Sequence, residues 1–565
     1  MKESRKQKQK KKIVSKIKTF SVPFSLEEIQ DNINIPKTAL IKRSKEEIIN
    51  KAFKFHSIGN ISEAVKYYKY FINEGFKDDK VFSNYGVILK NLGKLKEAEK
   101  LYRKAIKINP DYAEVYSNLG LTLKDLDQYE EALDSYLKVV ELNPIDTNIY
   151  FLITILLKDI NPKVLNNSKL KNIFNILLEK TNIPHNYLFR TFEILYKEKI
   201  LTNYRKSNTI DTTIELLSND KLIIIALKRI IFRDPMLEKL LTQARKRICY
   251  RIANNNESEQ QLNIQLIIAL AEQCFMNEYI YSKNEDENKL VNGILHRSIN
   301  GELSEKIISI LACYFPLYKL INKIPSLKNF NTSNQKFKEL IKLQIYEPLK
   351  EIELSKNIKR YGSINNSISQ KVKSQYEENP YPRWRFLNNS GDQKKSLVEI
   401  VNNEIQPNHI NYKTGNKQLK ILVAGCGTGQ QILQAQRYKN AKIIGIDLSL
   451  SSLSYAKRKL NELGIDNVEL LQMDILEVEL LEENFDVIEC SGVLHHMDNP
   501  AKGLEVLLGV LKKTGIFKLG LYSELARKDI VEARNYIANK KLQANKDNIR
   551  DFRKTVFSGE LAKLN

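Results

Sequence analysis

A 34-residue repeat is the feature that most constrains the fold of this 565-residue chain. Equivalent positions in three successive units carry the same kind of side chain: Ala64, Ala98 and Ala132; Tyr68, Tyr102 and Tyr136; Ile48, Phe82 and Tyr116; Ala52, Gly86 and Gly120. The small residues let two helices cross closely, and the aromatic residues fill the space beside them. The pattern predicts three stacked helix–turn–helix units over residues 45–144.

This repeat resembles the tetratricopeptide repeat, and the resemblance covers residues 45–144 as three units. Pro110 and Pro144 end the second and third units, whereas the first unit has Phe76 there and Ala52 in place of the usual glycine. The resemblance implies that a protein or peptide partner binds in a concave groove. A rigid spacer or an oligomerisation surface remains the alternative.

The periodicity changes at Leu419. Short β-branched runs now alternate with helical patterns: LKILVA, AKIIGI, VELLQM, FDVIEC and GIFKLGL. Strands that alternate with helices form a parallel sheet with helices on both faces. The sequence therefore predicts a doubly wound, mostly parallel α/β domain over residues 419–525, joined to an N-terminal helical part.

A glycine-rich turn follows the first of these strands, at Gly425-Cys426-Gly427-Thr428-Gly429. Residues without a Cβ atom let backbone N–H groups approach a ligand closely. Asp447 ends the second strand, 22 residues after Gly425, where its carboxylate can accept hydrogen bonds from ribose hydroxyls. Asp474 follows the third strand and suits an adenine amino group. A dinucleotide fingerprint would need a third glycine at position 430, which is Gln430, so the glycine spacing argues against it.

The ordered motifs VAGCGTG, IDLS, MDIL and FDVIECSGVLHHM resemble those of the class I S-adenosylmethionine-dependent methyltransferases, over about residues 415–525. With the repeats, the whole chain resembles bacterial proteins that fuse tetratricopeptide repeats to such a domain. The resemblance implies a Rossmann-like fold, S-adenosylmethionine as cofactor and methyl transfer to an unknown O, N or C nucleophile. The expected cofactor-binding residues are Gly425, Cys426, Gly427, Gly429, Asp447, Leu448, Asp474, Ile475 and Ser491.

His495 and His496, just past the fourth strand, are the candidate bases, although either could instead point into the fold or to solvent. Val423 stands where the family usually has an acidic residue, which puts one contact to the methionine part of the cofactor in question. The fourth-strand motif is neither that of amino methylation on bases nor the Pro-Cys of cytosine C5 enzymes, since Glu489-Cys490 stands there. Cys490 is expected to be a buried small apolar residue.

The segment QYEENPYPRW, from Gln375 to Trp384, precedes this domain. Its two prolines predict an extended, aromatic-rich link. One interpretation is a packed linker between domains. The other is a lid over the ligand site, formed by Tyr376, Tyr381 and Trp384.

Charge and cysteine content limit the partners. The net charge is +23, but residues 419–525 hold more acidic than basic residues, and the excess is spread over the rest of the chain. A nucleic-acid partner is therefore disfavoured. Five cysteines without a C-x-x-C pair indicate a reducing, cytoplasmic setting with no metal site, and no apolar run reaches the length of a membrane span.

The remaining segments complete the expected domain plan. Residues 1–44 read as a basic disordered arm, 145–375 as an all-helical region, 376–418 as the linker or lid, and 526–565 as a helical tail. Asp234–Pro235 is a helix-start signal. On one helix of the middle region, the polar residues are interpreted as the edge of a packed helix rather than a site: Glu272, Cys274 and Glu278.

No alternating run follows Gly515–Leu521, so the sequence predicts a five-stranded sheet that lacks the family's last two strands. Its fifth strand would be an edge, which is a pairing liability. Two functions stay open. The first is a methyltransferase whose repeats recruit a substrate or partner protein. The second is a repeat-based scaffold with a vestigial methyltransferase domain.

Overall fold

The computed structural model describes residues 44–254, 262–385, 394–405, 408, 410 and 417–559. The predicted basic arm lies outside the described residues, except for Ser44. The chain divides into two compact units. The first comprises residues 1–77 and 398–413, and the second comprises residues 78–397 and 414–565.

In the first unit, helices α1 (Lys45–Ser57) and α2 (Ile61–Asn73) form the first repeat hairpin. Ser44 caps α1, because its side chain accepts from the Glu47 N–H while the Glu47 carboxylate accepts from the Ser44 N–H. Ala52 and Tyr68, two of the repeat positions, are buried between the two helices. The helix α20 (Leu397–Glu404) begins at the boundary between the two units.

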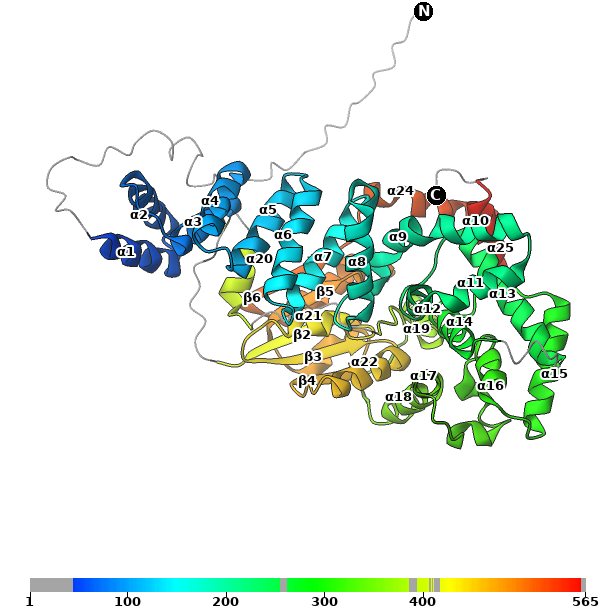
Figure 1. Cartoon of the computed structure of the whole chain (residues 1–565). Coiled ribbons are helices and arrows are strands. Elements are labelled where there is room, and N and C mark those ends of the chain that lie inside the picture. The colour runs from blue at the N-terminus through cyan, green and yellow to red at the C-terminus, as the bar shows by residue number, and fades with distance from the viewer. Residues whose placement is uncertain are drawn as a thin grey trace, which may run out of the picture. The chain divides into compact units, whose positions relative to one another are not determined.

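The second unit begins with two further hairpins, α3 (Asp79–Asn91) with α4 (Leu95–Ile108) and α5 (Ala113–Asp125) with α6 (Tyr129–Leu142) (Figure 1). A Cβ atom on Gly86 would lie 2.6 Å from Cε1 of Tyr102, and one on Gly120 would lie 2.5 Å from Cε1 of Tyr136. The repeated glycine and tyrosine therefore belong together, since each tyrosine ring occupies the space that the glycine leaves. The expected helical hairpins are present.

A helical region follows the repeats, coloured from cyan to green in Figure 1. Asp234 starts one of its helices as expected, with its carboxylate accepting from the N–H groups of Met236 and Leu237. The elements of the region are α7 (Thr147–Asp159), η1 (Pro162–Val164), α8 (Asn167–Glu179), η2 (His185–Leu188), α9 (Phe189–Phe192), η3 (Glu193–Lys197), α10 (Glu198–Ser207), α11 (Ile210–Asn219), α12 (Lys221–Arg229), α13 (Pro235–Ala253), α14 (Ile264–Met276), α15 (Glu285–Ile299), α16 (Glu305–Ala312), η5 (Leu317–Leu320), η6 (Pro325–Asn329), α17 (Gln335–Ile341), η7 (Lys342–Tyr346), α18 (Glu347–Ser355) and α19 (Ser367–Glu378).

Three expectations for this part of the chain were wrong. Residues 145–375 are not entirely helical, because β1 (Lys359–Arg360) pairs in parallel with the sheet. The predicted extended link is helical as far as Glu378, since the first proline comes only at position 380. Glu272 and Cys274 are buried within α14 rather than at its polar edge, and Glu278 lies beyond the end of the helix.

The C-terminal sheet has six parallel strands in the order β1-β4-β3-β2-β5-β6. The five predicted strands are β2 (Leu419–Ala424), β3 (Ala441–Asp447), β4 (Val468–Gln472), β5 (Phe485–Ser491) and β6 (Leu511–Gly520). The count of five was wrong, because the two-residue β1 adds a strand beside β4. Strand β6 is an edge as expected, and among the described residues after Gly520 there is no further strand.

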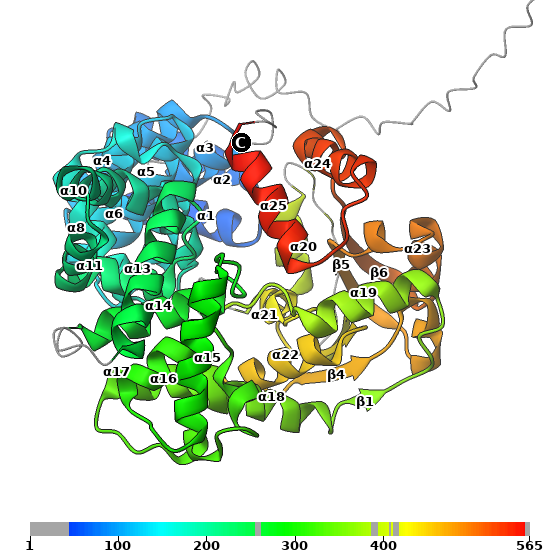
Figure 2. The same cartoon turned by 90° about the vertical axis from the view of Figure 1, so that its right-hand side faces the viewer.

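Helices separate successive strands of this sheet: α21 (Gln430–Ala435), α22 (Leu450–Glu462) and α23 (Pro500–Gly509), with the short η8 (Ile475–Leu481) and η9 (Leu494–His496). Figure 2 shows α18 of the helical region beside α22. The buried core of the sheet includes Leu422, Ile446 and Ile488. The tail is helical as expected, with η10 (Leu525–Arg527), α24 (Lys528–Asn539) and α25 (Lys546–Phe557).

Candidate functional site

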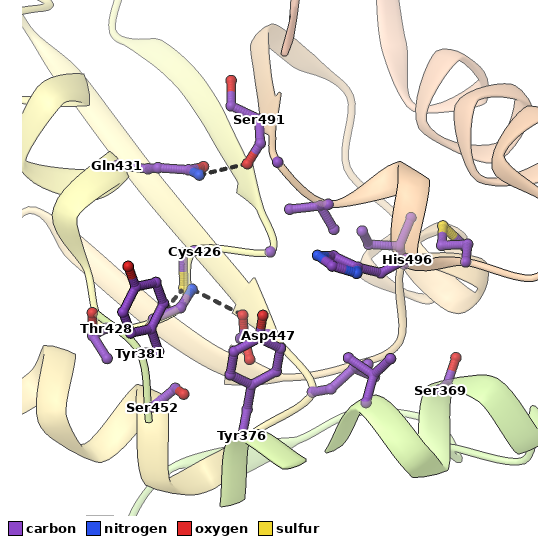
Figure 3. A pocket seen from close by; sticks show the side chains of 18 of the residues that line it. Ser369, Tyr376, Tyr381, Cys426, Thr428, Gln431, Asp447, Ser452, Ser491 and His496 are labelled. Atoms are coloured by element: carbon purple, nitrogen blue, oxygen red, sulfur yellow. Dashed lines mark hydrogen bonds between the residues drawn. The ribbon is translucent and has the colours of Figure 1, made fainter. Parts of the chain in front are cut away.

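A cavity of 270 Å³ lies at the carboxyl ends of β2, β3, β4 and β5 (Figure 3). Ligands of open parallel sheets bind at this edge, because the loops that follow the strands converge there. The cavity is lined by Ser369, Val372, Tyr376, Tyr381, Pro382, Gly425, Cys426, Gly427, Thr428, Gln430, Gln431, Asp447, Leu448, Ser452, Met473, Asp474, Ile475, Ser491, Gly492, Val493, His496, Met497 and Tyr522. Most of the residues proposed from sequence therefore face one space.

The glycine turn needs residues without a side chain. Gly425 and Gly427 have φ angles of 71° and 51°, in the left-handed region that glycine adopts without strain. A Cβ atom on Gly425 would also lie 2.5 Å from Cγ2 of Val493, in the loop after β5. Gly429 lies at the start of α21 and does not line the cavity. The turn therefore fits closely against the neighbouring loop, and the N–H groups of Gly425 and Cys426 are both bonded to the Ile446 carbonyl at the end of β3.

Asp447, at the end of β3, is bonded to the glycine turn. One carboxylate oxygen accepts from the Gly427 N–H at 2.8 Å, a bond drawn in Figure 3, and the other accepts from the Ser449 N–H at 2.9 Å. Burial raises the pKa of Asp447, and the backbone hydrogen bonds act in the opposite direction. Each carboxylate oxygen keeps a further lone pair, so Asp447 can still accept hydroxyl donors from the cavity.

The other acid, Asp474, is buried and begins η8, where its carboxylate accepts from the Leu476 N–H at 3.0 Å. Leu448 and Ile475 add apolar side chains to the lining. Elsewhere in the lining, the Ser491 carbonyl accepts from the side-chain amide of Gln431 at 2.7 Å (Figure 3). Sequence reasoning missed Gln431, whose only signal is its position in the first turn of the helix after the glycines.

The two histidines lie against each other, with their Nε2 atoms 3.1 Å apart. His496 points into the cavity in Figure 3, whereas His495 stacks near Tyr522, with ring centroids 4.2 Å apart, and does not line the cavity. Burial lowers the pKa of both rings, and the cations Arg527 and Arg534 lower it further. A neutral imidazole is therefore available at the cavity wall near neutral pH.

The aromatic residues of the linker take two different positions. Tyr376 and Tyr381 line the cavity, whereas Trp384 lies outside its lining. The indole N–H of Trp384 donates to the Thr428 carbonyl at 2.9 Å, behind the glycine turn. The geometry thus separates the two linker tyrosines from the tryptophan.

Val423 is buried in β2 and pairs in register with Glu489 of β5. The Glu489 carboxylate accepts from Arg437 at 2.7 Å and from the Tyr438 hydroxyl at 2.8 Å. Its hydrogen bonds therefore join β5 to the segment after α21 and do not face the cavity lining. The adjacent Cys490 is buried, and burial raises the pKa of its thiol to about 12, which leaves it an uncharged apolar side chain.

These features fit an adenosine-containing cofactor. A Cβ atom on Gly425 would clash with Val493 of the cavity lining, and Asp447 offers acceptors from the end of the second core strand. Among the described residues, no group of three or more His, Cys, Asp or Glu side chains gathers as metal ligands. None of the described helices has both the length and the apolarity that a bilayer crossing requires.

Known families match both parts of the chain. A methyltransferase-domain model matches residues 415–557, and tetratricopeptide repeat models match residues 86–127 and 113–146. An uncharacterized protein of Synechococcus, syc1184_c, is 36% identical over 121 residues, which are 21% of this chain and 29% of that protein. The ubiquinone biosynthesis O-methyltransferase of Pseudomonas fluorescens is 30% identical over 122 residues, 21% of this chain and 51% of that enzyme.

Among solved structures, PKMT2 from Rickettsia typhi in complex with AdoHcy is 24% identical and covers 26% of this chain and 28% of that one. The TM-score of that match is 0.22. The chain spans about a third to a half of the length of the curated relatives described above.

The class of protein follows from the fold, the site and the family models together. The chain carries tetratricopeptide repeats, matched over residues 86–146, and a methyltransferase domain, matched over residues 415–557. The expectation of this fusion, and of an α-helical part followed by an α/β sheet, is confirmed.

Proposed function

We propose that this chain is an S-adenosylmethionine-dependent methyltransferase that methylates an acceptor carrying a removable proton. The observation that carries the proposal is a single cavity shared by the glycine turn, the Asp447 carboxylate and the His496 ring. The first two suit a cofactor, and the third suits the proton chemistry of an acceptor.

In this proposal the cofactor-binding residues are those named from the sequence, of which Gly429 starts α21 and does not itself line the cavity. The glycine turn brings the backbone close to the cofactor, with its Gly425, Cys426 and Gly429 N–H groups bonded within the domain, and Asp447 accepts from the ribose hydroxyls. Asp474 retains one oxygen for the adenine amino group beside its capping bond. When bound, S-adenosylmethionine supplies an activated methyl group on its sulfonium. The protein then has mainly to align the acceptor and exclude water.

His496 is the proposed base. Its lowered pKa keeps it neutral, so it can take the proton from an acceptor hydroxyl or amine. His495 lies within hydrogen-bond distance and is also neutral, so its Nε2 can accept a hydrogen bond from the protonated ring and stabilise the charge. The pair thus both removes the proton and holds it.

The repeats are proposed to recruit a protein substrate or partner. Support comes from the tetratricopeptide models over residues 86–146 and from the helical hairpins α3 to α6. We take the domain bounds from the sequence: repeats over 45–144, methyltransferase core over 419–525. All five cysteines are free and buried, which supports the proposed cytoplasmic location.

Calorimetry with S-adenosylhomocysteine tests cofactor binding. Asp447→Ala is expected to weaken binding by about 1–3 kcal/mol, through loss of charge-assisted hydrogen bonds. Asp466→Ala, which removes an exposed carboxylate before β4, is the matched control and should bind like the wild type. A folded wild-type protein that shows neither heat nor a thermal shift would overturn the proposal.

Transfer is tested by incubating cell extract with radiolabelled S-adenosylmethionine and finding which fraction is labelled. His496→Gln is expected to keep S-adenosylhomocysteine binding and lose most of the labelling, about 10²-fold or more. The competing scaffold function, favoured by Val423 at the usual acidic position, predicts no labelling by the wild type and partner capture that survives Asp447→Ala.

A further inference from the structure

Residues 381–385 connect the glycine turn to the helical region by a series of hydrogen bonds. On the turn side, the Thr428 hydroxyl donates to the Pro382 carbonyl at 2.6 Å, and the Trp384 indole N–H donates to the Thr428 carbonyl at 2.9 Å. Both partners of Thr428 therefore come from this one segment; Pro382 and Thr428 line the cavity, whereas Trp384 lies outside its lining.

On the other side, Arg385 reaches into the helical region. Its guanidinium donates to the Glu272 carboxylate at 2.6 Å and to the Lys228 carbonyl at 2.9 Å. Glu272 is 1% exposed, and its second oxygen lies 3.0 Å from Nζ of Lys228. A buried carboxylate paired with two cations is hard to displace. If either cation moves away, the carboxylate stays buried with less compensation for its lost hydration.

The segment between these two ends is itself anchored to α22. The Tyr455 hydroxyl donates to the Trp384 carbonyl at 2.5 Å, and the Lys459 ammonium donates to the Arg385 carbonyl at 3.1 Å. The Trp384 side chain is 8% exposed, so its ring is packed as well as bonded. The same helix is joined to α18, because Arg458 lies 2.8 Å from Glu351 and 3.3 Å from Glu347.

We propose that Glu272, acting through Arg385 and Trp384, is a positioning residue for the glycine turn. The helical region then holds the turn in the conformation that receives the cofactor, which gives a role to a region without a catalytic motif. This inference rests on the proposed function, because its main readout is cofactor affinity.

A second ion pair on the same segment provides a matched control. Arg383 lies 3.2 Å from Glu278, also next to α14, but their side chains are 28% and 45% exposed. Among the described residues, Arg383 makes no hydrogen bond to the glycine turn. Glu278→Gln removes the same charge from the same side of the segment without loosening Thr428.

The test measures S-adenosylhomocysteine affinity by calorimetry and acrylamide quenching of Trp384, the only tryptophan of the chain. Glu272→Gln is expected to weaken binding about threefold to thirtyfold and to raise quenching in the absence of ligand. Glu272→Asp, which retains the charge, should restore part of the affinity. Glu278→Gln should stay within about twofold of the wild type.

Trp384→Phe tests the link to the turn, since it keeps an aromatic ring while it removes the indole donor and part of the buried ring. It should weaken binding about threefold or more without changing the melting temperature to the same extent as Glu272→Gln. This variant decides the question if Glu272→Gln does not fold. Wild-type affinity in folded Glu272→Gln and Trp384→Phe would overturn the inference.

The experiment distinguishes failure of the positioning role from failure of the proposed function. If the wild type itself binds no S-adenosylhomocysteine, the proposed function fails, and the positioning role is then judged by quenching alone. Equal quenching of Trp384 in Glu272→Gln and Glu278→Gln would overturn it. Greater quenching in Glu272→Gln, but not in Glu278→Gln, would support the link from Glu272 through Arg385 to Trp384.

Discussion

The repeat hairpins and the helical region that follows them are both built mainly of packed helices, yet their buried side chains differ in kind. In the hairpins α3 to α6, Tyr102 and Tyr136 fill the space that Gly86 and Gly120 leave open. In the helical region, by contrast, a charged side chain lies at the centre. Arg245 and its partner Glu287 are each 2% exposed.

The interior of the helical region is built on this pair. Arg245 donates to Glu287 at 2.9 Å and to the Ser282 carbonyl at 2.7 Å, and the Tyr314 hydroxyl donates to the same carboxylate at 2.6 Å. The two regions therefore specify the packing of their helices in different ways. Steric fit between small and aromatic residues can recur in every repeat unit, whereas a buried polar network favours a single arrangement of the helices that contribute to it.

Breaking the buried pair should have the largest effect. Arg245→Met leaves Glu287 buried without its cation, and is expected to lower the free energy of unfolding by about 3–5 kcal/mol. Urea unfolding followed by circular dichroism measures it. The double variant Arg245→Met/Glu287→Leu removes both charges and should recover most of the loss. A double variant less stable than the single one would contradict this account.

A methyl group at a repeat glycine should have the next largest effect. Glycine to alanine in a helix usually stabilises by about 1 kcal/mol. At Gly120 the new Cβ would overlap the buried ring of Tyr136, so Gly120→Ala should instead destabilise by about 1–3 kcal/mol. Gly293→Ala in α15 is the control, because its Cβ would meet nothing within 4 Å. Similar effects of the two substitutions on the urea midpoint would refute the steric explanation.

The same contrast explains what the sequence could predict. The hairpins could be predicted because glycine and tyrosine recur every 34 residues. The cofactor-site candidates could be predicted because they lie at or just beyond the carboxyl ends of parallel strands. Asp447 was expected to bind ribose, and the structure adds that it also holds the Gly427 N–H. Features of this kind can be predicted from one sequence, because the residues that define them recur at fixed spacings along the chain.

Non-local contacts could not be predicted in this way. Strand β1 has two residues and forms only by pairing with β4, more than a hundred positions later in the chain. Glu272 was interpreted as a polar edge because nothing near it in sequence indicates Arg385, its partner across the fold. The exposure of a single carboxylate depends on its tertiary partner, and one sequence does not show that partner.

The helical region should also be the more acid-sensitive of the two. Burial, with a smaller contribution from Arg229, lowers the pKa of His185 to about 3. The unfolded chain binds this proton below about pH 6.5 and the folded chain does not. Stability present above pH 6.5 is therefore lost as the pH falls toward 3, by about 1.4 kcal/mol per unit.

His185→Gln should flatten the dependence of unfolding free energy on pH between these limits. The matched control in the first repeat is His56→Gln, since His56 is only half-buried and its pKa is lowered less strongly. Parallel urea titrations across this pH range check both variants. If the difference in unfolding free energy between the wild type and His185→Gln does not change with pH, then His185 is not buried in its neutral form.

The smallest effect is expected from an ion pair on the surface of the repeats. Arg103 of α4 lies 2.9 Å from Glu99 and 2.5 Å from Glu131 of α6, and its side chain is 46% exposed. Water solvates these charges when the contact is lost, so Arg103→Gln should cost less than about 1 kcal/mol. The loss should shrink further between about 0.05 M and about 0.5 M salt, because the shorter Debye length screens exposed charges but leaves the Arg245 pair largely unaffected. Urea midpoints of both variants at the two salt concentrations provide the measurement. A salt-independent loss at Arg103 as large as that of Arg245→Met would show that the repeats, too, depend on charge pairing rather than on steric fit.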